Sequence, residues 1–292
     1  MSAIVCVAGD VMLDVLVVTQ GPIRVDDDTP AAITLSAGGQ AANVAAWVCA
    51  LGGEARLYGP RSRDAVGQVT DERLLARGIT LCAEPQDARC GTVVSLVTSG
   101  TRSLASDPGD LGWIDDGLSD SSWLAGADWL HLSGYLLLRA PDPEVVIRAS
   151  LAARHEGVRV SIDLASASMI ETYGAAAFWA LVEKLAPTVV FGNEGEWDVV
   201  GVLPTSLSSP TSPTSPTSPT SLTVEAVVKR GARGSSFVVG GVQTSRDVVP
   251  GPVVDVTGAG DAMAAGYFVG GPEMAMVAAA RCVAQIGAQP RL

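Results

Sequence analysis

The sequence predicts an α/β protein in which a parallel β-sheet is covered by helices. Strand-like segments alternate with helical segments between residues 127 and 191, and this alternation implies right-handed crossovers between parallel strands. In addition, the first strand, at residues 3–7, is a continuous apolar run, which is typical of a strand buried on both faces. Ligands of such sheets bind at the carboxyl ends of the strands.

The predicted elements follow the apolar runs and the glycine and proline residues between them. Strands are expected at residues 3–7, 15–18, 31–35, 54–58, 79–83, 127–132, 158–162, 188–191, 224–229 and 236–239, with a further strand-like run at 248–254 that contains two prolines. Helices are expected at residues 41–51, 64–77, 143–155, 175–185, 262–269 and 273–286. Gly52 and Gly53 end the first helix in the way that C-cap glycines do.

A hairpin interrupts the α/β pattern. Residues 92–98 alternate loosely between apolar and polar side chains, and Gly100 turns the chain back into residues 102–106. Antiparallel strands among α/β units predict a separate small sheet that covers a site.

Composition limits the classes of function. The 292 residues, 48% of them hydrophobic, suffice for one large domain or two smaller ones. A net charge of −12 with only 19 Lys and Arg argues against nucleic acid or an anionic membrane as a partner. Five scattered cysteines without a CxxC pair indicate buried thiols in a reducing compartment, and two histidines exclude a His-rich metal centre. The sequence has no signal-peptide pattern and no membrane-spanning apolar run, so we expect a soluble cytoplasmic protein.

Residues 207–222 are a low-complexity segment of Ser, Thr and Pro. Between its terminal leucines the segment has no apolar residue to bury, and its prolines exclude a helix. We expect an exposed insertion within one domain, because the strands on both sides are needed for the same sheet.

The motif Asp255-Val256-Thr257-Gly258-Ala259-Gly260-Asp261 precedes the predicted helix at 262–269. A glycine-rich turn that enters a helix leaves several N–H groups unpaired at the positive end of the helix dipole, and phosphate is the usual ligand there. Asp261 would repel a phosphate unless it has a chemical role. The pattern therefore favours a general base beside an anion hole. The alternative is a structural loop in which an acid caps the helix.

Several other residues have both a binding and a structural interpretation. Gly38 and Gly39 allow the backbone to approach either a ligand or another segment closely. Asn43 lies in an otherwise apolar helix and needs a polar partner if it is buried. Asp14 is either a ligand-binding acid or a solvated turn residue. His131, alone in an apolar run, favours a core histidine over a catalytic one.

Two spacings later in the chain are also ambiguous. Asn193 and Glu196 lie three residues apart at a helix start that follows a strand. They could face one ligand, and an amide with a carboxylate suits hydrated magnesium near phosphates; the alternative is a capping box. Gly231 and Gly234 favour a tight hairpin over a backbone that lies near a ligand.

Gly38-Gly39 with Asn43, then Asn193-x-x-Glu196, Gly231-x-x-Gly234 and the motif that ends at Asp261 resemble, in order and spacing, the motifs of the ribokinase-like (PfkB) carbohydrate and nucleoside kinases. The resemblance implies a single domain over residues 1–292 with a three-layer α/β/α ribokinase-like fold. The central sheet would be mostly parallel, and a small β-sheet lid would come from about residues 11–35 and 92–106. It implies transfer of the γ-phosphoryl group of ATP, with magnesium, to a hydroxyl group of a sugar or nucleoside, usually a CH2OH.

The resemblance also assigns roles to individual residues. Asp261 corresponds to the catalytic base, beside an anion hole of Gly258, Ala259 and Gly260. Substrate hydroxyls would bind Asp14, Gly38, Gly39 and Asn43. The magnesium and phosphate motif corresponds to Asn193 and Glu196, and the nucleotide side to Lys229, Gly231 and Gly234. Several members of the family bind a monovalent cation, usually potassium, at the positions of Asp255 and Thr257.

Some positions depart from the family pattern. Gln40 replaces a common lysine, Lys229 stands where a threonine is frequent, and the chain stops at Leu292, which trims the expected wall around the adenine and cation sites. The alternatives to a sugar kinase are a nucleoside kinase, a binding protein without turnover, and a dinucleotide-dependent oxidoreductase. Against the oxidoreductase, the sequence lacks the GxGxxG motif that such an enzyme carries after its first strand. An exposed lid sheet predicts a homodimer.

Overall fold

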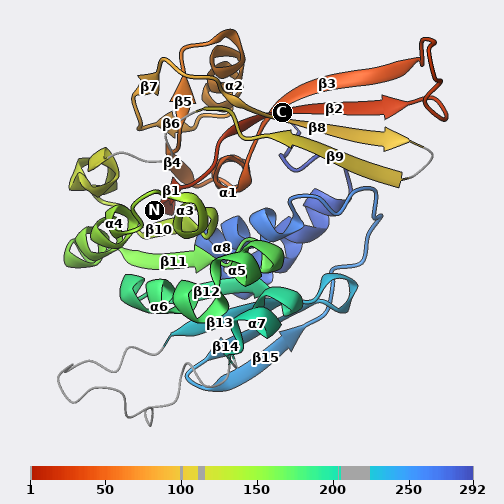
Figure 1. Ribbon diagram of the computed structural model, residues 1–292. Helices are drawn as coiled ribbons and strands as arrows, with labels where there is room; N and C mark the ends of the chain where they lie inside the picture. Colours follow the sequence, from red (N-terminus) through yellow and green to blue (C-terminus); the bar gives the residue numbers. More distant parts are fainter. Residues whose placement is uncertain (1, 99–100, 111–115, 203, 205–223, 292) are drawn as a thin grey trace.

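The computed structural model describes residues 2–98, 101–110, 116–202, 204 and 224–291. Within these residues, nine strands form a sheet in the order β15-β14-β13-β12-β11-β10-β1-β4-β6 (Figure 1). Its strands are β1 (Ile4–Ala8), β4 (Glu54–Tyr58), β6 (Thr80–Leu81), β10 (Trp129–Ser133), β11 (Arg159–Asp163), β12 (Val189–Asn193), β13 (Glu225–Lys229), β14 (Ser235–Val239) and β15 (Val242–Arg246). Every neighbouring pair from β6 to β13 is parallel, and the pairs β13–β14 and β14–β15 are antiparallel. The predicted, mostly parallel sheet is confirmed.

Helices cover both faces of this sheet and enclose two hydrophobic cores. One core lies under α1 (Gln40–Ala50), α2 (Ala65–Leu75) and α8 (Ala259–Val283). The other lies under α3 (Tyr135–Arg139), α4 (Glu144–His155), α5 (Ala167–Tyr173), α6 (Ala175–Leu185) and α7 (Glu194–Val200). Along β1, Val5 and Val7 belong to the first core and Cys6 and Ala8 to the second, because successive side chains of a strand point to opposite faces. The continuous apolar run of β1 thus supplies both cores.

A separate four-stranded sheet has the order β3-β2-β8-β9 and projects from the body of the protein (Figure 1). It consists of β2 (Met12–Thr19), β3 (Ala31–Gly38), β8 (Gly91–Thr98) and β9 (Thr101–Asp107). The pairs β2–β3 and β8–β9 are antiparallel, and β2–β8 is parallel. The two strands of the predicted hairpin, β8 and β9, pair with each other, and β8 also pairs with β2, which in turn pairs with β3; Gly100 lies outside the described residues. A short pair, β5 (Arg61–Ser62) with β7 (Pro85–Gln86), completes the strands of the described chain.

The structure corrects the prediction at the edge of the sheet and at the end of the chain. Residues 248–254 form no strand, because Pro250 and Pro252 lack the N–H groups that a strand needs for pairing. The strand that follows β14 at this edge is β15 instead, which the sequence analysis missed. The two helices predicted at 262–269 and 273–286 are one run, α8, interrupted at Gly270 and Gly271, and it ends at Val283.

Short helices were harder to foresee. The structure adds α3 and α5, which have five and seven residues, to the helices predicted from longer apolar patterns. The Ser/Thr/Pro insertion predicted at residues 207–222 lies outside the described residues. Over the part of the chain that the structure describes, no helix has the length and apolar character needed to cross a membrane.

Candidate active site

A cavity of about 550 Å³ lies where the carboxyl ends of β11, β12 and β13 face the beginning of α8. This is the edge of the sheet at which ligands of parallel sheets bind. Its polar lining consists of Gln40, Asp163, Asn193, Glu196, Lys229 and Asp261. Its other side is apolar, with Val248, Val249, Pro250, Pro252, Val253, Met276, Ala279 and Val283.

The glycine-rich turn at the start of α8 forms one wall of the cavity through Ala259, Gly260 and Asp261. Gly258 has a φ of 74°, and a Cβ there would lie 2.7 Å from the Cα of Ala288, so both the conformation and the space require glycine. The N–H of Ala262 donates to the carbonyl of Gly258 at 2.9 Å, whereas among the described residues the N–H groups of Gly260 and Asp261 have no backbone acceptor. These two N–H groups are available to an anion.

Asp261 is held at this turn by Asn43, whose Nδ2 donates to Oδ2 of Asp261 at 2.8 Å. The predicted polar partner of Asn43 is therefore the candidate base itself. Burial raises the pKa of Asp261 to about 8 against the opposing hydrogen bond from Asn43, with a further raising contribution from Asp163 and a lowering one from Lys229. A carboxyl group with a pKa near neutrality is suited to accept a proton.

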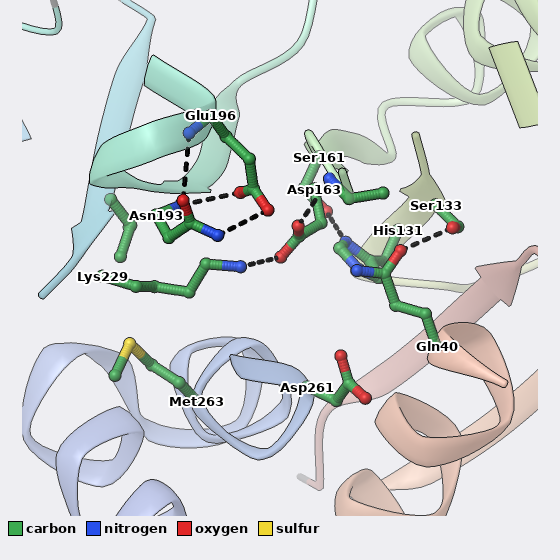
Figure 2. A network of polar contacts seen from close by, with 12 residues as sticks. Gln40, His131, Ser133, Ser161, Asp163, Asn193, Glu196, Lys229, Asp261 and Met263 are labelled. Carbon is green, nitrogen blue, oxygen red and sulfur yellow. Dashed lines mark hydrogen bonds and ion pairs between the residues drawn. The ribbon is translucent and has the colours of Figure 1, made fainter. Parts of the chain in front are cut away.

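Figure 2 shows two separate polar pairs around the cavity, Lys229 with Asp163 and Asn193 with Glu196. Nζ of Lys229 donates to Oδ2 of Asp163 at 2.6 Å, and both side chains are largely buried, at 14% and 2% exposure. Burial alone would lower the pKa of Lys229, but the carboxylates of Asp163 and Glu196 outweigh it and the pKa is raised. A Cβ at Gly260 would lie 3.2 Å from this Nζ. Lys229 is therefore a cation that reaches from Asp163 to the glycine-rich turn.

Asp163 is a residue of the candidate site that sequence analysis did not single out as functional. The available signal was its position, since it ends a strand of the parallel sheet. Its Oδ1 also accepts a hydrogen bond from the N–H of Ala165 at 3.1 Å, which ties the β11 end to the loop that follows.

Asn193 and Glu196 form the capping box that was one of their two interpretations. The N–H of Glu196 donates to Oδ1 of Asn193 at 3.0 Å, and the N–H of Asn193 donates to Oε2 of Glu196 at 2.7 Å. Nδ2 of Asn193 also donates to Oε1 at 2.6 Å. Burial raises the pKa of Glu196, and Lys229 opposes the shift. The capping role does not exclude the other one, since both side chains line the cavity.

The Glu196 carboxylate fits magnesium held through water. Each of its oxygens accepts a hydrogen bond from Asn193 and retains a lone pair. Mg²⁺ prefers oxygen ligands and usually keeps several of its own water molecules, which could donate to these lone pairs. Direct ligation by several carboxylates does not fit, because the described part of the chain contains no group of three or more His, Cys, Asp or Glu suited to hold a metal ion.

Gly38 and Gly39 pack against another segment of the protein. A Cβ at Gly38 would lie 2.2 Å from the carboxyl group of Asp14, and one at Gly39, where φ is 95°, would lie 2.4 Å from the carbonyl oxygen of Asp10. Gly38 thus allows β3 to lie against Asp14 of β2, and Gly39 allows the turn into α1 to pass close to Asp10, which follows β1. Asp14 is partly exposed; burial raises its pKa to about 6, and Arg102 opposes the shift. Neither glycine nor Asp14 lines the cavity.

Two further predictions of structure hold. Gly231 and Gly234 form a tight turn in which the N–H of Arg230 donates to the carbonyl of Gly234 at 2.9 Å, and both glycines also line the cavity. His131 is a core residue, since it is 1% exposed and its Nδ1 lies 2.9 Å from Oγ of Ser161. Burial lowers its pKa to about 4, so the ring is neutral at physiological pH.

The three layers and the small projecting sheet define a ribokinase-like fold. The adenosine kinase of Sinorhizobium meliloti superposes with a TM-score of 0.79 at 22% identity, covering 100% of this chain and 97% of that one. An uncharacterised sugar kinase of Pyrococcus horikoshii in complex with ATP gives a TM-score of 0.75 at 17% identity, covering 98% and 95%. At these identities the likeness defines the fold.

Sequence similarity defines the family. The pfkB family of carbohydrate kinases matches residues 2–289, and the protein belongs to this family. The fructokinase of Escherichia coli is 32% identical over 169 residues, which are 56% of this chain and 51% of the fructokinase. The match thus spans about half the length of this curated relative. Membership in a kinase family removes the oxidoreductase alternative.

Proposed function

We propose that the protein is a kinase that transfers the γ-phosphoryl group of ATP to a CH2OH group of a sugar. The observation that carries the proposal is the position of Asp261. Its carboxyl group lines a cavity at the start of α8, beside N–H groups of Gly260 and Asp261 that have no backbone acceptor among the described residues. A base and an anion hole at one point are what phosphoryl transfer to an alcohol requires.

In the reaction, Asp261 accepts the proton of the acceptor hydroxyl group. The hydroxyl oxygen forms a bond to the γ-phosphorus while the bond from that phosphorus to the bridging oxygen of ADP breaks. Asn43 donates to Oδ2 of Asp261, which orients the carboxylate and leaves Oδ1 for the hydroxyl proton. The free amides of the turn stabilise charge on the transferred group, and Lys229 adds a positive charge 3.2 Å from where a Cβ of Gly260 would lie.

The two sides of the cavity suit the two ends of ATP. The apolar side, between residues 248–253 and the second half of α8, would take the adenine, and the polar side would take the phosphates. Gly231 and Gly234 border the nucleotide in this arrangement, and Asn193 and Glu196 would hold magnesium through its waters. Magnesium would supply charge neutralisation on the phosphates.

The acceptor would bind on the side of Asp261 that faces α1 and the small sheet. Asn43 and Asp14 supply polar groups there, and Gly38 and Gly39 keep the backbone close to them. The sequence similarity to a fructokinase supports a sugar, and a nucleoside is the alternative acceptor. We further propose that the small sheet is a lid, which would exclude water during transfer.

The remaining parts of the proposal concern assembly and location. The outward face of the small sheet carries Ile33 and Val94, which are 65% and 37% exposed, and contact with a second copy through this face would give a homodimer. Light scattering that finds only monomer would contradict it. A cytoplasmic location agrees with five free cysteines and with the supply of ATP there.

The test is ADP formation from ATP and Mg²⁺ in a screen of pentoses, hexoses and nucleosides. Acceptor-dependent ADP release is expected for at least one sugar, and D261N should lower kcat at least ~100-fold, as loss of a general base does. If no acceptor stimulates turnover although ATP binds, the protein is a binding relative without turnover. If D261N retains near-normal turnover, the assignment of the base is wrong.

A further inference from the structure

The carboxylate of Asp255 organises the turn that leads to the candidate anion hole. Its Oδ1 accepts hydrogen bonds from the N–H of Thr257 at 3.0 Å and from Oγ1 of Thr257 at 2.6 Å. Its Oδ2 accepts the N–H of Gly287 at 3.0 Å. The Asp255 side chain is 11% exposed. This carboxylate therefore joins the beginning of the turn to the segment that follows α8.

A fourth donor reaches the same carboxylate from the small sheet. Nη1 of Arg102, on β9, lies 3.2 Å from Oδ1 of Asp255, and the Arg102 side chain is 28% exposed. Nε of Arg102 donates to Oγ of Ser95 on β8 at 2.8 Å, and Ser95 is buried. The sheet register puts Arg102 and Ser95 on the same face as Asp14. Arg102 is thus positioned by its own sheet and points its charge at the catalytic turn.

Backbone oxygens near Asp255 also have donors. The carbonyl of Thr257 accepts the thiol of Cys282 at 3.2 Å. The carbonyl of Ala288 accepts Nε1 of Trp47 at 2.8 Å, and the Cys282 thiol lies 3.6 Å from it. Potassium in proteins is held by several oxygens that replace its hydration shell. Here Oδ1 of Asp255 already has three donors, and Oδ2 and these two carbonyls each have at least one donor.

The residues therefore do not fit the monovalent cation that the family resemblance assigns to Asp255 and Thr257. A potassium ion on Oδ1 of Asp255 would compete with three donors already on that oxygen, and one of them carries a full positive charge. Two cations that share one carboxylate oxygen repel each other strongly when they are partly shielded from water.

We propose that Arg102 takes the place of the monovalent cation at Asp255, so that the small sheet supplies the charge that orders the catalytic turn and the enzyme needs no potassium. This proposal rests on the proposed kinase function. Arg102 is a positioning residue, because it acts on the turn through Asp255 and touches no reacting atom. A consequence is that the turn is ordered only while the small sheet lies against the body of the protein.

The experiment compares potassium chloride with tetramethylammonium chloride at equal ionic strength, for the wild type, R102A and R102K. The readouts are the melting temperature and the Kd of Mg²⁺ with AMP-PNP, a non-hydrolysable ATP analogue. Crystals soaked in thallium acetate report directly on a site, because Tl⁺ replaces K⁺ and gives an anomalous signal. R89A is the matched control, since Arg89 also pairs with two carboxylates beside the small sheet, Asp107 and Asp110, but is 61% exposed.

For the wild type and R89A we expect less than a twofold effect of potassium on the AMP-PNP Kd and no Tl⁺ peak at Asp255. In R102A, potassium should tighten AMP-PNP binding at least fivefold and raise the melting temperature, and Tl⁺ should bind within ligating distance of Asp255. In R102K the effect of potassium on the AMP-PNP Kd should lie between those of R102A and the wild type, since lysine keeps the positive charge but lacks the planar guanidinium group.

A Tl⁺ peak at Asp255 in the wild type, or a fivefold potassium effect on its AMP-PNP Kd, would overturn the proposal. So would an R102A variant that responds to potassium no more than the wild type does. If R102A does not fold, the wild-type measurements decide alone. Failure of AMP-PNP to bind any variant would count against the kinase function instead, and the Tl⁺ and melting experiments would still decide the role of Arg102.

Discussion

Replacement of Asp261 by asparagine should stabilise the protein while it removes activity. The pKa of Asp261 rises from 3.8 to about 8 on folding, so the folded state holds a proton that the unfolded state releases. The sign follows directly: the protonated carboxyl favours the folded state at low pH, and this contribution is lost as pH rises from about 4 to about 8. At ~1.4 kcal/mol per pH unit, the wild type loses on the order of 4 kcal/mol from this group between pH 5 and pH 8.

The asparagine side chain of the D261N variant does not titrate, so the variant keeps that stability. Thermal melting at pH 5, 6, 7 and 8 measures the difference between D261N and the wild type. The advantage of D261N should grow with pH by roughly 8 °C over this range, at about 2 °C per kcal/mol for a chain of this size. D107N serves as control: hydrogen bonds from the N–H of Gly109 and from Arg89 lower the pKa of Asp107, so its effect should be flat above pH 5. An advantage of D261N that does not change between pH 5 and 8 would refute the burial argument.

Three further predictions concern catalysis. In the wild type, kcat/KM should rise tenfold per pH unit up to about pH 8, since the free enzyme must ionise Asp261; a flat profile between pH 6 and 8 would contradict this. N43A removes the donor to Asp261 at 2.8 Å, so the apparent pKa in the same profile should increase and kcat should fall about tenfold, whereas an unchanged pKa would show that Asn43 does not act on the base. K229M removes the cation between Asp163 and the turn, so it should lower kcat/KM for ATP at least ~10-fold. K229R keeps a positive charge and should restore part of the loss. Equal kinetics for K229M and the wild type would exclude Lys229 from phosphate binding.

Local patterns were enough to predict most of the main sheet. Strand β4 and helix α6 have the predicted bounds, at 54–58 and 175–185, because Gly53 and Gly59 bound the strand and Gly174 and Pro187 bound the helix. The run at 248–254 failed because apolar composition alone does not provide pairing groups, and its two prolines decide against a strand. Elements of five to seven residues, such as α3 and α5, depend on packing that a sequence pattern does not contain.

The candidate site was predictable where one motif contains both the shape and the chemistry. Gly258 and Asp261 lie within four residues, so the turn and the acid could be inferred together. Asp163 could not be inferred in this way, because its partner Lys229 is 66 residues away and only the adjacency of the strand ends brings them together. Arg102 and Asp255, 153 residues apart, are joined by the placement of the small sheet, which no local spacing indicates.

One cause underlies both the stability and the catalytic predictions for Asp261. Burial beside Asp163 and Asp10 raises the free energy of the ionised carboxylate, which costs folding stability at neutral pH. The same cost makes the carboxylate a stronger base, and a base is most effective when its pKa lies near the working pH. The two measurements must therefore agree. If D261N melts no higher than the wild type at pH 8, the kcat/KM profile should level off well below pH 8, and a profile that still rises to pH 8 would belong to another group.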